Sequence, residues 1–255
     1  MADVQLSGVS KAFRARSAVL SALEGIDLGI GEQEFVSVVG PSGCGKSTLL
    51  RIVAGLIPPS SGEVLVHGRR VQGPPEEVGI VFQHPVLLPW RTVLGNIELQ
   101  VEIRGYDLRR YRRKAEELIA LVGLQGFEDS LPYQLSGGMQ QRVALCRALI
   151  HGPSLLLMDE PFGALDALTR EQMNLELYRV WRETHTTVMF ITHSITEAVF
   201  LSQRIVVMTP RPGRIASVVG VNLLPGRSID SMREPEFLDR TQEVRRIMSA
   251  SGFGD

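Results

Sequence analysis

The residues best suited to chemistry form a glycine-rich stretch between an apolar run, residues 35–39, and an apparent helix, residues 49–54. In a strand–loop–helix arrangement, glycine N–H groups can turn toward an anion while the helix start points its dipole at the same place. Lys46 can then reach the β- and γ-phosphates of a nucleotide, and the Ser47 hydroxyl can bind Mg²⁺. The stretch therefore predicts a nucleoside triphosphate site. It consists of Gly40, Pro41, Ser42, Gly43, Cys44, Gly45, Lys46, Ser47 and Thr48.

Two carboxylates close another apolar run, residues 154–158. On the strand beside the phosphate loop, Asp159 could hold Mg²⁺ directly or through water. Glu160 could then polarise a water molecule for in-line attack on the γ-phosphate. Taken alone, an apolar run that ends in two acids is equally typical of a strand followed by a turn.

A second anion site is indicated by Ser136, Gly137 and Gly138, which open a predicted helix over residues 138–149. The serine hydroxyl, the glycine N–H groups and the helix dipole could all face a phosphate. A plain helix cap by Ser136 is the alternative interpretation.

The two cysteines, Cys44 and Cys146, are too few for a disulfide framework. Cys44 precedes a helix start, which should favour its thiolate, so alkylation there could block nucleotide binding. The favoured alternative is that Cys44 is only a small residue that fits the loop. Cys146 is predicted to be a packing residue.

The composition limits the classes of partner. The formal net charge of -1 over 255 residues provides no basic field for nucleic acid, so no nucleic-acid partner is expected. No signal segment follows Met1, and no run of about 18 apolar residues could span a bilayer. We therefore expect a reducing cytoplasmic location, with any membrane role exerted through a partner protein.

The apolar pattern predicts a buried parallel sheet, a smaller antiparallel layer and a block of helices inserted between strands. The parallel strands are expected at 35–39, 79–83, 154–160, 186–193 and 205–208. The antiparallel strands are expected at 3–9, 26–30 and 62–68, with a turn at Glu24 and Gly25. The inserted helices are expected at 92–102, 108–122 and 138–149. Phe237, Val244 and Met248 recur at helical spacing and predict a closing amphipathic helix.

These motifs resemble, in order and approximate spacing, those of ATP-binding cassette (ABC) ATPases over about residues 1–220. The sequence Leu-Ser-Gly-Gly-Met-Gln at 135–140 is highly specific to that family. The resemblance implies an α/β fold: a phosphate-loop NTPase core with a RecA-like, mostly parallel sheet, an antiparallel β subdomain and an inserted helical subdomain. It places the core and β subdomain at 1–84 and 151–220, the helical subdomain at 85–150, and a short tail at 221–255.

The resemblance also implies a head-to-tail homodimer that holds two ATP molecules, each with Mg²⁺, between phosphate loop and signature sequence. In that arrangement Glu160 is the catalytic base, Gln83 senses Mg²⁺ and the attacking water, and His193 contacts the γ-phosphate. Asp166 communicates across the dimer, and Gln140 belongs to the signature sequence at the nucleotide. Phe13 is expected to stack on adenine. From the residues alone, His193 could be an ordinary loop residue and Phe13 a core side chain.

An apolar segment over residues 85–94 follows Gln83 and is either core of the helical block or a docking surface for a membrane partner. Residues 87–93 and 208–215 resemble the ATPase subunits of nitrate, sulfonate and taurine importers. Such systems pair two ATPase subunits with two permeases and, indirectly, a substrate-binding protein. The resemblance thus implies a peripheral protein at the cytoplasmic face of the inner membrane. The basic run 109–114 is expected to be a solvated helix face, because Glu116 and Glu117 follow it.

Other classes of function remain as rivals. A soluble cassette ATPase acting in DNA repair or translation would carry paired cassettes, long coiled coils or zinc modules, and this sequence has none of these. A small-molecule kinase leaves Ser136, Gly137, Gly138 and Glu160 unexplained. An exporter or lipid-trafficking cassette shares every nucleotide motif.

Overall fold

A computed structural model describes residues 2–15, 18–224 and 226–251. The parts of the predicted regions that fall on residues 1, 16–17, 225 and 252–255 lie outside the described residues.

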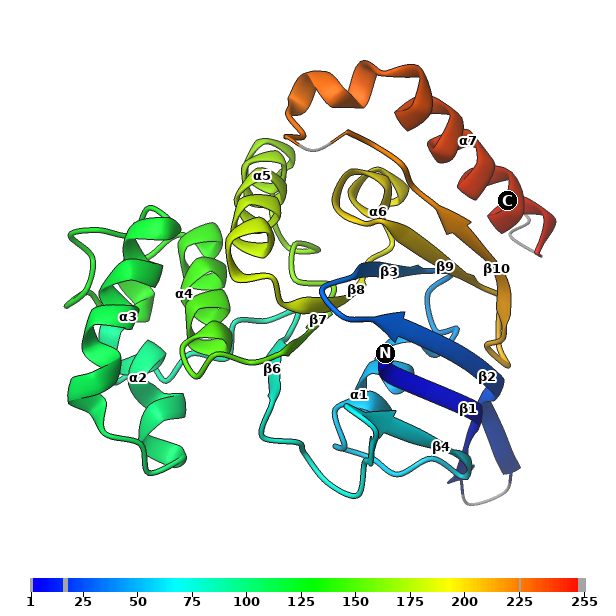
Figure 1. The fold of residues 1–255 in the computed structure, drawn as a ribbon, viewed down its shortest axis with the longest axis horizontal. Helices are drawn as coiled ribbons and strands as arrows, with labels where there is room; N and C mark the ends of the chain where they lie inside the picture. The colour runs from blue at the N-terminus through cyan, green and yellow to red at the C-terminus, as the bar shows by residue number, and fades with distance from the viewer. Residues whose placement is uncertain (1, 16–17, 225, 252–255) are drawn as a thin grey trace.

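A six-stranded sheet in the order β10-β9-β3-β8-β7-β6 forms the centre of the molecule (Figure 1). Five of these strands run parallel, and β10 pairs antiparallel with β9. Every residue of β3, β7 and β8 is buried, which is why these strands are nearly continuous apolar runs. The strands are β3 (Phe35–Val39), β6 (Val78–Val81), β7 (Leu155–Asp159), β8 (Thr187–Ile191), β9 (Arg204–Met208) and β10 (Ile215–Gly220).

The sheet divides the apolar interior into two cores, because successive side chains on a strand point to opposite faces. In β7, Leu156 and Met158 face the core shared with the long helices. Leu155 and Leu157 face the other core, which contains the helix after the phosphate loop and the antiparallel sheet. Figure 1 shows α5 and α6 on one side of the sheet and α1 on the other. These helices are α1 (Lys46–Val53), α5 (Ala167–Thr184) and α6 (Ile195–Leu201).

A second, antiparallel sheet has the strand order β2-β1-β4-β5. Its strands are β1 (Ala2–Ala15), β2 (Ala18–Gly31), β4 (Ser61–Val66) and β5 (Arg69–Arg70). The first two strands are longer than predicted, and the turn expected at Glu24 and Gly25 is wrong. Both residues lie within β2, where Gly25 has a φ of 59° and its N–H donates to the Ser10 hydroxyl at 3.0 Å. A local irregularity in the pairing of β1 with β2 accommodates this glycine, so the strand continues.

Three helices project beyond the β6 edge of the central sheet (Figure 1). They are α2 (Val93–Ile103), α3 (Leu108–Leu121) and α4 (Gly137–Leu149), with a short 3₁₀ turn, Pro132–Gln134, before α4. Thr92, Asp107 and Ser136 cap their N-termini with side-chain oxygens, which satisfy backbone donors that a helix start leaves unpaired. The chain is thus an α/β protein with an antiparallel sheet and an inserted helical block, as predicted.

The end of the described chain contains one element that the sequence did not suggest and one that it did. Strand β10 was not predicted, because its residues alternate between intermediate and exposed positions and only Val219 is buried. Helix α7 (Pro235–Ala250), preceded by the 3₁₀ turn Ile229–Arg233, is the predicted amphipathic helix. Phe237, Val244 and Met248 are buried against the larger core.

A hydrogen-bonded chain of side chains joins the two sheets. His67, in the turn between β4 and β5, lies 2.9 Å from a carboxylate oxygen of the buried Asp3 and 2.6 Å from the Ser154 hydroxyl. Asp3 also accepts a hydrogen bond from Thr187 at the start of β8. Polar groups therefore fix the antiparallel sheet against the ends of β7 and β8. Within the described residues, no helix combines the length and apolar character needed to cross a membrane.

We predict that Asn96→Ala will destabilise the fold more than an ordinary helix substitution. The fully buried Asn96 amide accepts from the Leu88 N–H at 2.7 Å and donates to the carbonyls of Leu88, Arg91 and Thr92. Loss of these partners should lower the free energy of unfolding by about 2–4 kcal/mol in urea denaturation. Ile103→Ala, on the exposed side of the same helix, is the control and should cost less than about 1 kcal/mol. Equal effects of the two substitutions would show that Asn96 does not anchor the segment before α2.

Candidate active site

The glycine-rich stretch lies between the buried strand β3 and the start of α1, as the sequence predicts. Gly45 is the N-cap of α1 and has a φ of 106°. A Cβ atom at this position would lie 2.7 Å from Leu23 Cδ2 and 2.8 Å from the Ala22 carbonyl. Only glycine combines this backbone conformation with so close an approach to β2. The loop is therefore held in a shape in which the first N–H groups of α1 remain available to an anion.

Lys46 is buried and crosses the mouth of this loop. Its ammonium group donates to the carbonyls of Gly40 at 2.9 Å and Pro41 at 3.1 Å, and lies 3.7 Å from a Glu160 carboxylate oxygen. A positive charge is thus positioned beside the helix start, where phosphate would bind.

Ser47 and Asp159 meet directly, with the serine hydroxyl donating to the carboxylate at 2.8 Å. The expectation that Asp159 lies on the strand beside the phosphate loop is wrong, because β8 separates β3 from β7. The two residues nevertheless meet, because α1 packs across both β7 and β8. Burial raises the pKa of the Asp159 carboxyl, and the hydrogen bond from Ser47 opposes that rise. A buried carboxylate beside a hydroxyl is a donor pair suited to a hard cation such as Mg²⁺.

Glu160 and His193 are also in contact, with His193 Nδ1 3.2 Å from a Glu160 carboxylate oxygen. Glu160 has a φ of 44°, a conformation that costs a non-glycine residue about 1–3 kcal/mol, and its N–H donates to the Ile191 carbonyl at 2.9 Å. In this conformation a Glu160 carboxylate oxygen lies 3.7 Å from the Lys46 ammonium. A Cβ atom at Gly163 would lie 3.4 Å from Gln83 Nε2 and 3.8 Å from His193 Cε1, so Gln83 borders the same place.

A cavity of about 260 Å³ opens over the phosphate loop. Phe13, which is 41% exposed, lines it and is therefore not a core side chain. Three lining residues were missed by sequence reasoning: Leu20 and Ala22 on β2, and Arg211 on the loop after β9. Pairing of β1 with β2 brings Phe13 opposite Leu20. No local sequence pattern predicts this neighbour.

The predicted reactivity of Cys44 is contradicted by its surroundings. The side chain is 1% exposed, and burial, the largest influence, raises the pKa of its thiol although the charge of Lys46 opposes the rise. Desolvation of the thiolate outweighs the helix start. Cys146 is fully buried, as predicted, and its thiol points at the Leu118 carbonyl.

The second predicted anion site lies at the start of α4 and does not line the phosphate-loop cavity as described. Ser136 and Gly137 are exposed, and the Ser136 hydroxyl caps the helix by accepting from the Met139 N–H at 3.3 Å. Gly138 is buried, and a Cβ atom there would lie 2.7 Å from Thr169 Cγ2. The Gln140 amide donates to the carbonyls of Pro132 and Leu135, so its contacts in this structure fix the preceding loop.

The segment after Glu160 joins this second site to the first. Asp166 caps α5 by accepting from the Thr169 N–H at 3.0 Å, and these backbone hydrogen bonds lower the pKa of its carboxyl. Arg170 donates to the carbonyls of Phe162 and Leu165 and lies 3.5 Å from the buried carboxylate of Glu197. Asp166 therefore lies on an exposed turn whose backbone is held by the hydrogen bonds from Arg170.

Comparison with known proteins agrees with this geometry. Residues 23–163 match the family model described as ABC transporter, and this range contains the phosphate loop, both acids and the second anion site. The chain belongs to the ABC transporter family. It is 44% identical to the taurine import ATP-binding protein TauB of Rhizobium johnstonii, over 94% of each chain. It is 43% identical to the aliphatic sulfonates import ATP-binding protein SsuB of Bacillus cereus, over 95% of this chain and 93% of the relative.

A solved structure of an ATP-binding cassette is also similar to this ABC ATPase. That cassette is a dimer in a post-hydrolysis state, bound to ADP and phosphate. It is 35% identical, has a TM-score of 0.75, and aligns over 86% of this chain and 99% of its own length. Membership of the family identifies the chain as an ATP-binding, ATP-hydrolysing cassette and confirms the resemblance found in the sequence.

We predict that both thiols will resist modification in the native protein. Because burial raises their pKa, the thiolate fraction at pH 8 is smaller than that of a free cysteine, and access is closed as well. Titration with a chromogenic disulfide reagent should detect almost no reactive thiol in the native chain. In guanidinium chloride it should detect both of the two thiols. Rapid labelling of one native thiol, absent in Cys44→Ala, would contradict this assignment.

Proposed function

We propose that this ABC ATPase energises an importer of a small anion such as taurine, another sulfonate or nitrate. It would act as a peripheral subunit at the cytoplasmic face of the membrane, where it would join two permease chains and, through them, a substrate-binding protein. The import names of relatives that align along almost the whole chain support the direction and the cargo class. The observation that carries the proposal is that the chain has two glycine-containing helix starts, at Gly45 and at Ser136, of which the second does not line the phosphate-loop cavity. A second copy of the chain would bring the two together.

The phosphate loop, residues 40–48, would hold the triphosphate, with Lys46 on the β- and γ-phosphates. Ser47, Asp159 and Gln83 all present oxygen donors, which is the chemistry that Mg²⁺ requires. When bound, the ion neutralises charge on the transferring phosphoryl group. Phe13 at the cavity rim would cover the adenine face.

Glu160 would accept a proton from the attacking water, since its carboxylate is held at the loop mouth by the backbone of β8 and lies 3.7 Å from Lys46. His193, now 3.2 Å from that carboxylate, would turn to the γ-phosphate when nucleotide binds. Each role is a proposal drawn from the family motif and this geometry.

Closure of a dimer would bring Ser136, Gly137 and Gly138 of one chain to the γ-phosphate on the other. The exposure of Ser136 and Gly137 at the start of α4, away from the cavity of their own chain, fits such an arrangement. The dimeric state of the solved cassette with ADP and phosphate supports it. Asp166, on the exposed turn before α5, would lie at the same interface. Gln140 would act there by keeping the signature loop in shape.

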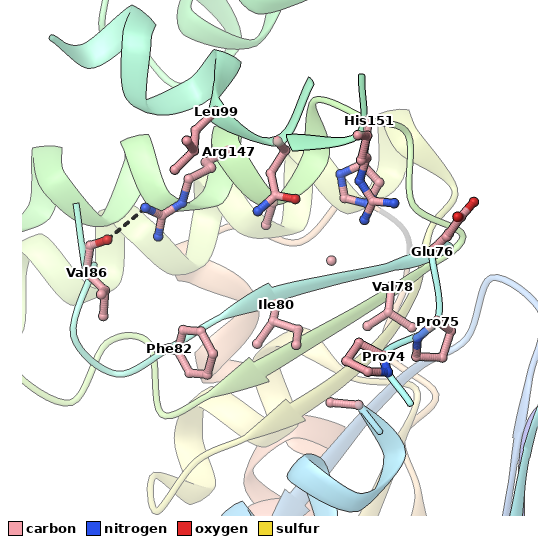
Figure 2. A pocket seen from close by; sticks show the side chains of 15 residues that line it. Pro74, Pro75, Glu76, Val78, Ile80, Phe82, Val86, Leu99, Arg147 and His151 are labelled. Carbon is pink, nitrogen blue, oxygen red and sulfur yellow. Dashed lines mark hydrogen bonds between the residues drawn. The ribbon is translucent and has the colours of Figure 1, made fainter. Parts of the chain in front are cut away.

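An apolar groove of about 380 Å³ is the docking site that we propose for the permease (Figure 2). Val78, Ile80 and Phe82 form its floor, and Leu99 of α2 and Arg147 of α4 form the opposite wall. We propose that a cytoplasmic helix of the permease fills it, since an exposed apolar groove beside polar residues is typical of an interface. We further propose that residues 85–150 form the lobe that this helix moves, with residues 221–255 as a tail.

One end of the groove is suited to an acidic side chain of that helix. Both ring nitrogens of His151 and the Arg104 Nε are buried without a hydrogen-bond partner among the described residues. Burial, reinforced by the charges of Arg104 and Lys114, lowers the pKa of His151 to about 4. A carboxylate from the partner would accept from the Arg104 Nε–H and from the single N–H of the neutral His151 ring.

We predict that Glu160→Gln will keep ATP binding and lower kcat by about 10²–10⁴-fold, because the amide cannot accept the proton.

The variant, purified from detergent-solubilised source cells with Mg-ATP, should retain a multi-span permease. Wild-type chain without nucleotide is the comparison. Recovery of ribosomes or DNA-repair proteins in place of a membrane protein would favour the soluble rival. A permease without an associated binding protein would favour the exporter.

We predict that Val86→Glu will separate hydrolysis from docking. Val86 is 63% exposed at the groove, so a charge there should leave ATPase activity of the isolated chain within about twofold while abolishing permease binding. Val218→Glu, an exposed site on β10, is the matched control and should bind permease normally. Permease binding that survives Val86→Glu would place the docking surface elsewhere.

A further inference from the structure

The loop between β9 and β10, residues 209–214, contacts the phosphate loop through Arg211. The Arg211 guanidinium donates from both Nε and Nη2 to the Gly43 carbonyl, at 3.1 and 2.9 Å. We propose that Arg211 is a positioning residue for the nucleotide, which orients the backbone of residues 43–44 toward the phosphate chain by holding the Gly43 carbonyl. The inference rests on the proposed role of residues 40–48 and adds a residue that none of the nucleotide motifs contains.

The geometry of one peptide unit carries this proposal. In a trans peptide the C=O and the following N–H point in opposite directions. Because Arg211 holds the Gly43 carbonyl, the Cys44 N–H points away from the guanidinium, toward the Pro41 carbonyl to which it now donates at 3.3 Å. Pro41 also accepts from Lys46 at 3.1 Å, so this N–H lies within the ring that Lys46 closes. Backbone N–H groups of such a loop are the ones that contact the α- and β-phosphates.

The loop that carries Arg211 is itself fixed. The Thr209 N–H donates to the Arg214 carbonyl at 2.9 Å, and the Arg214 N–H donates to the Thr209 hydroxyl at 3.0 Å. Gly213 exchanges backbone hydrogen bonds with β2 through Ala22 and Glu24, both at 3.0 Å. The two ends of the loop are hydrogen-bonded to each other and to β2, which forms a wall of the cavity. The contact between the Arg211 guanidinium and Gly43 therefore costs little conformational entropy.

Arg211 and Arg214 differ in whether a carboxylate pairs with the guanidinium. Arg214 forms an ion pair with Glu24 at 2.8 Å. Arg211 has no carboxylate partner among the ion pairs of the described residues, and it lines the nucleotide cavity. Its positive charge therefore adds to the field at the phosphates, as well as orienting the backbone.

The test compares Arg211→Ala and Arg211→Lys with wild type, in ATPase kinetics and in binding of ATP and ADP. Arg211→Ala should raise KM for ATP about ten- to a hundredfold and change kcat less than about threefold, because the reacting groups are untouched. The affinities for ATP and ADP should fall by the same factor, since the α- and β-phosphates are common to both. Arg211→Lys, which keeps one donor and the charge, should recover part of the loss.

Arg214→Ala is the matched control and should leave both nucleotide affinities unchanged. Loss of ATP affinity without loss of ADP affinity would overturn the proposal, because it would indicate direct contact with the γ-phosphate. Wild-type affinity in Arg211→Ala would overturn it as well. If Arg211→Ala fails to fold, Arg211→Lys decides the question by the same comparison. Lys46→Ala separates this inference from the proposed site: if it binds nucleotide as wild type does, the proposed site itself is wrong.

Discussion

The interaction on which the site depends is the placement of the Lys46 ammonium among three acceptors. The carbonyls of Gly40 and Pro41 and the carboxylate of Glu160 surround a positive charge that is almost removed from solvent. A buried ammonium needs such partners, and in meeting that need it closes the loop into a ring and draws the end of β7 to the start of α1. We propose that nucleotide phosphate replaces these acceptors when it binds. The loop is therefore built for an anion before one arrives.

Helix α4 links this site to the groove through side chains. The buried Gln141 amide donates to the Phe82 carbonyl at 3.2 Å, directly before Gln83. Arg147 donates to the carbonyls of Pro85 and Val86, at the rim of the groove (Figure 2). The same helix begins at the signature glycines, where Gly138 packs on α5. A partner that moves the groove would thus move α4, and with it the surface offered to the second nucleotide. The coupling that we propose consists of these contacts, all made by one helix.

The sequence predicted the parts of the fold that local patterns encode. Buried parallel strands are continuous apolar runs, and the helix cap Ser136 precedes its helix in sequence. What it could not predict depends on contacts between distant residues. The insertion of β8 between β3 and β7, the pairing that brings Leu20 opposite Phe13, and the reach of Arg211 to Gly43 leave no local pattern. The buried state of Cys44 was missed for the same reason, because it belongs to a core to which other strands contribute residues such as Leu23 and Met208.

We propose that a complete catalytic site of this ATPase forms only between two chains. The decisive experiment is a structure of the Glu160→Gln variant with Mg-ATP. It should show a two-fold dimer in which residues 40–48 of one chain bind each triphosphate. The Ser136 hydroxyl and the Gly138 N–H of the other chain should lie within hydrogen-bond distance of the γ-phosphate. A closed state in which residues 136–138 of both chains remain in solvent, with ATP contacted by one chain alone, would contradict it.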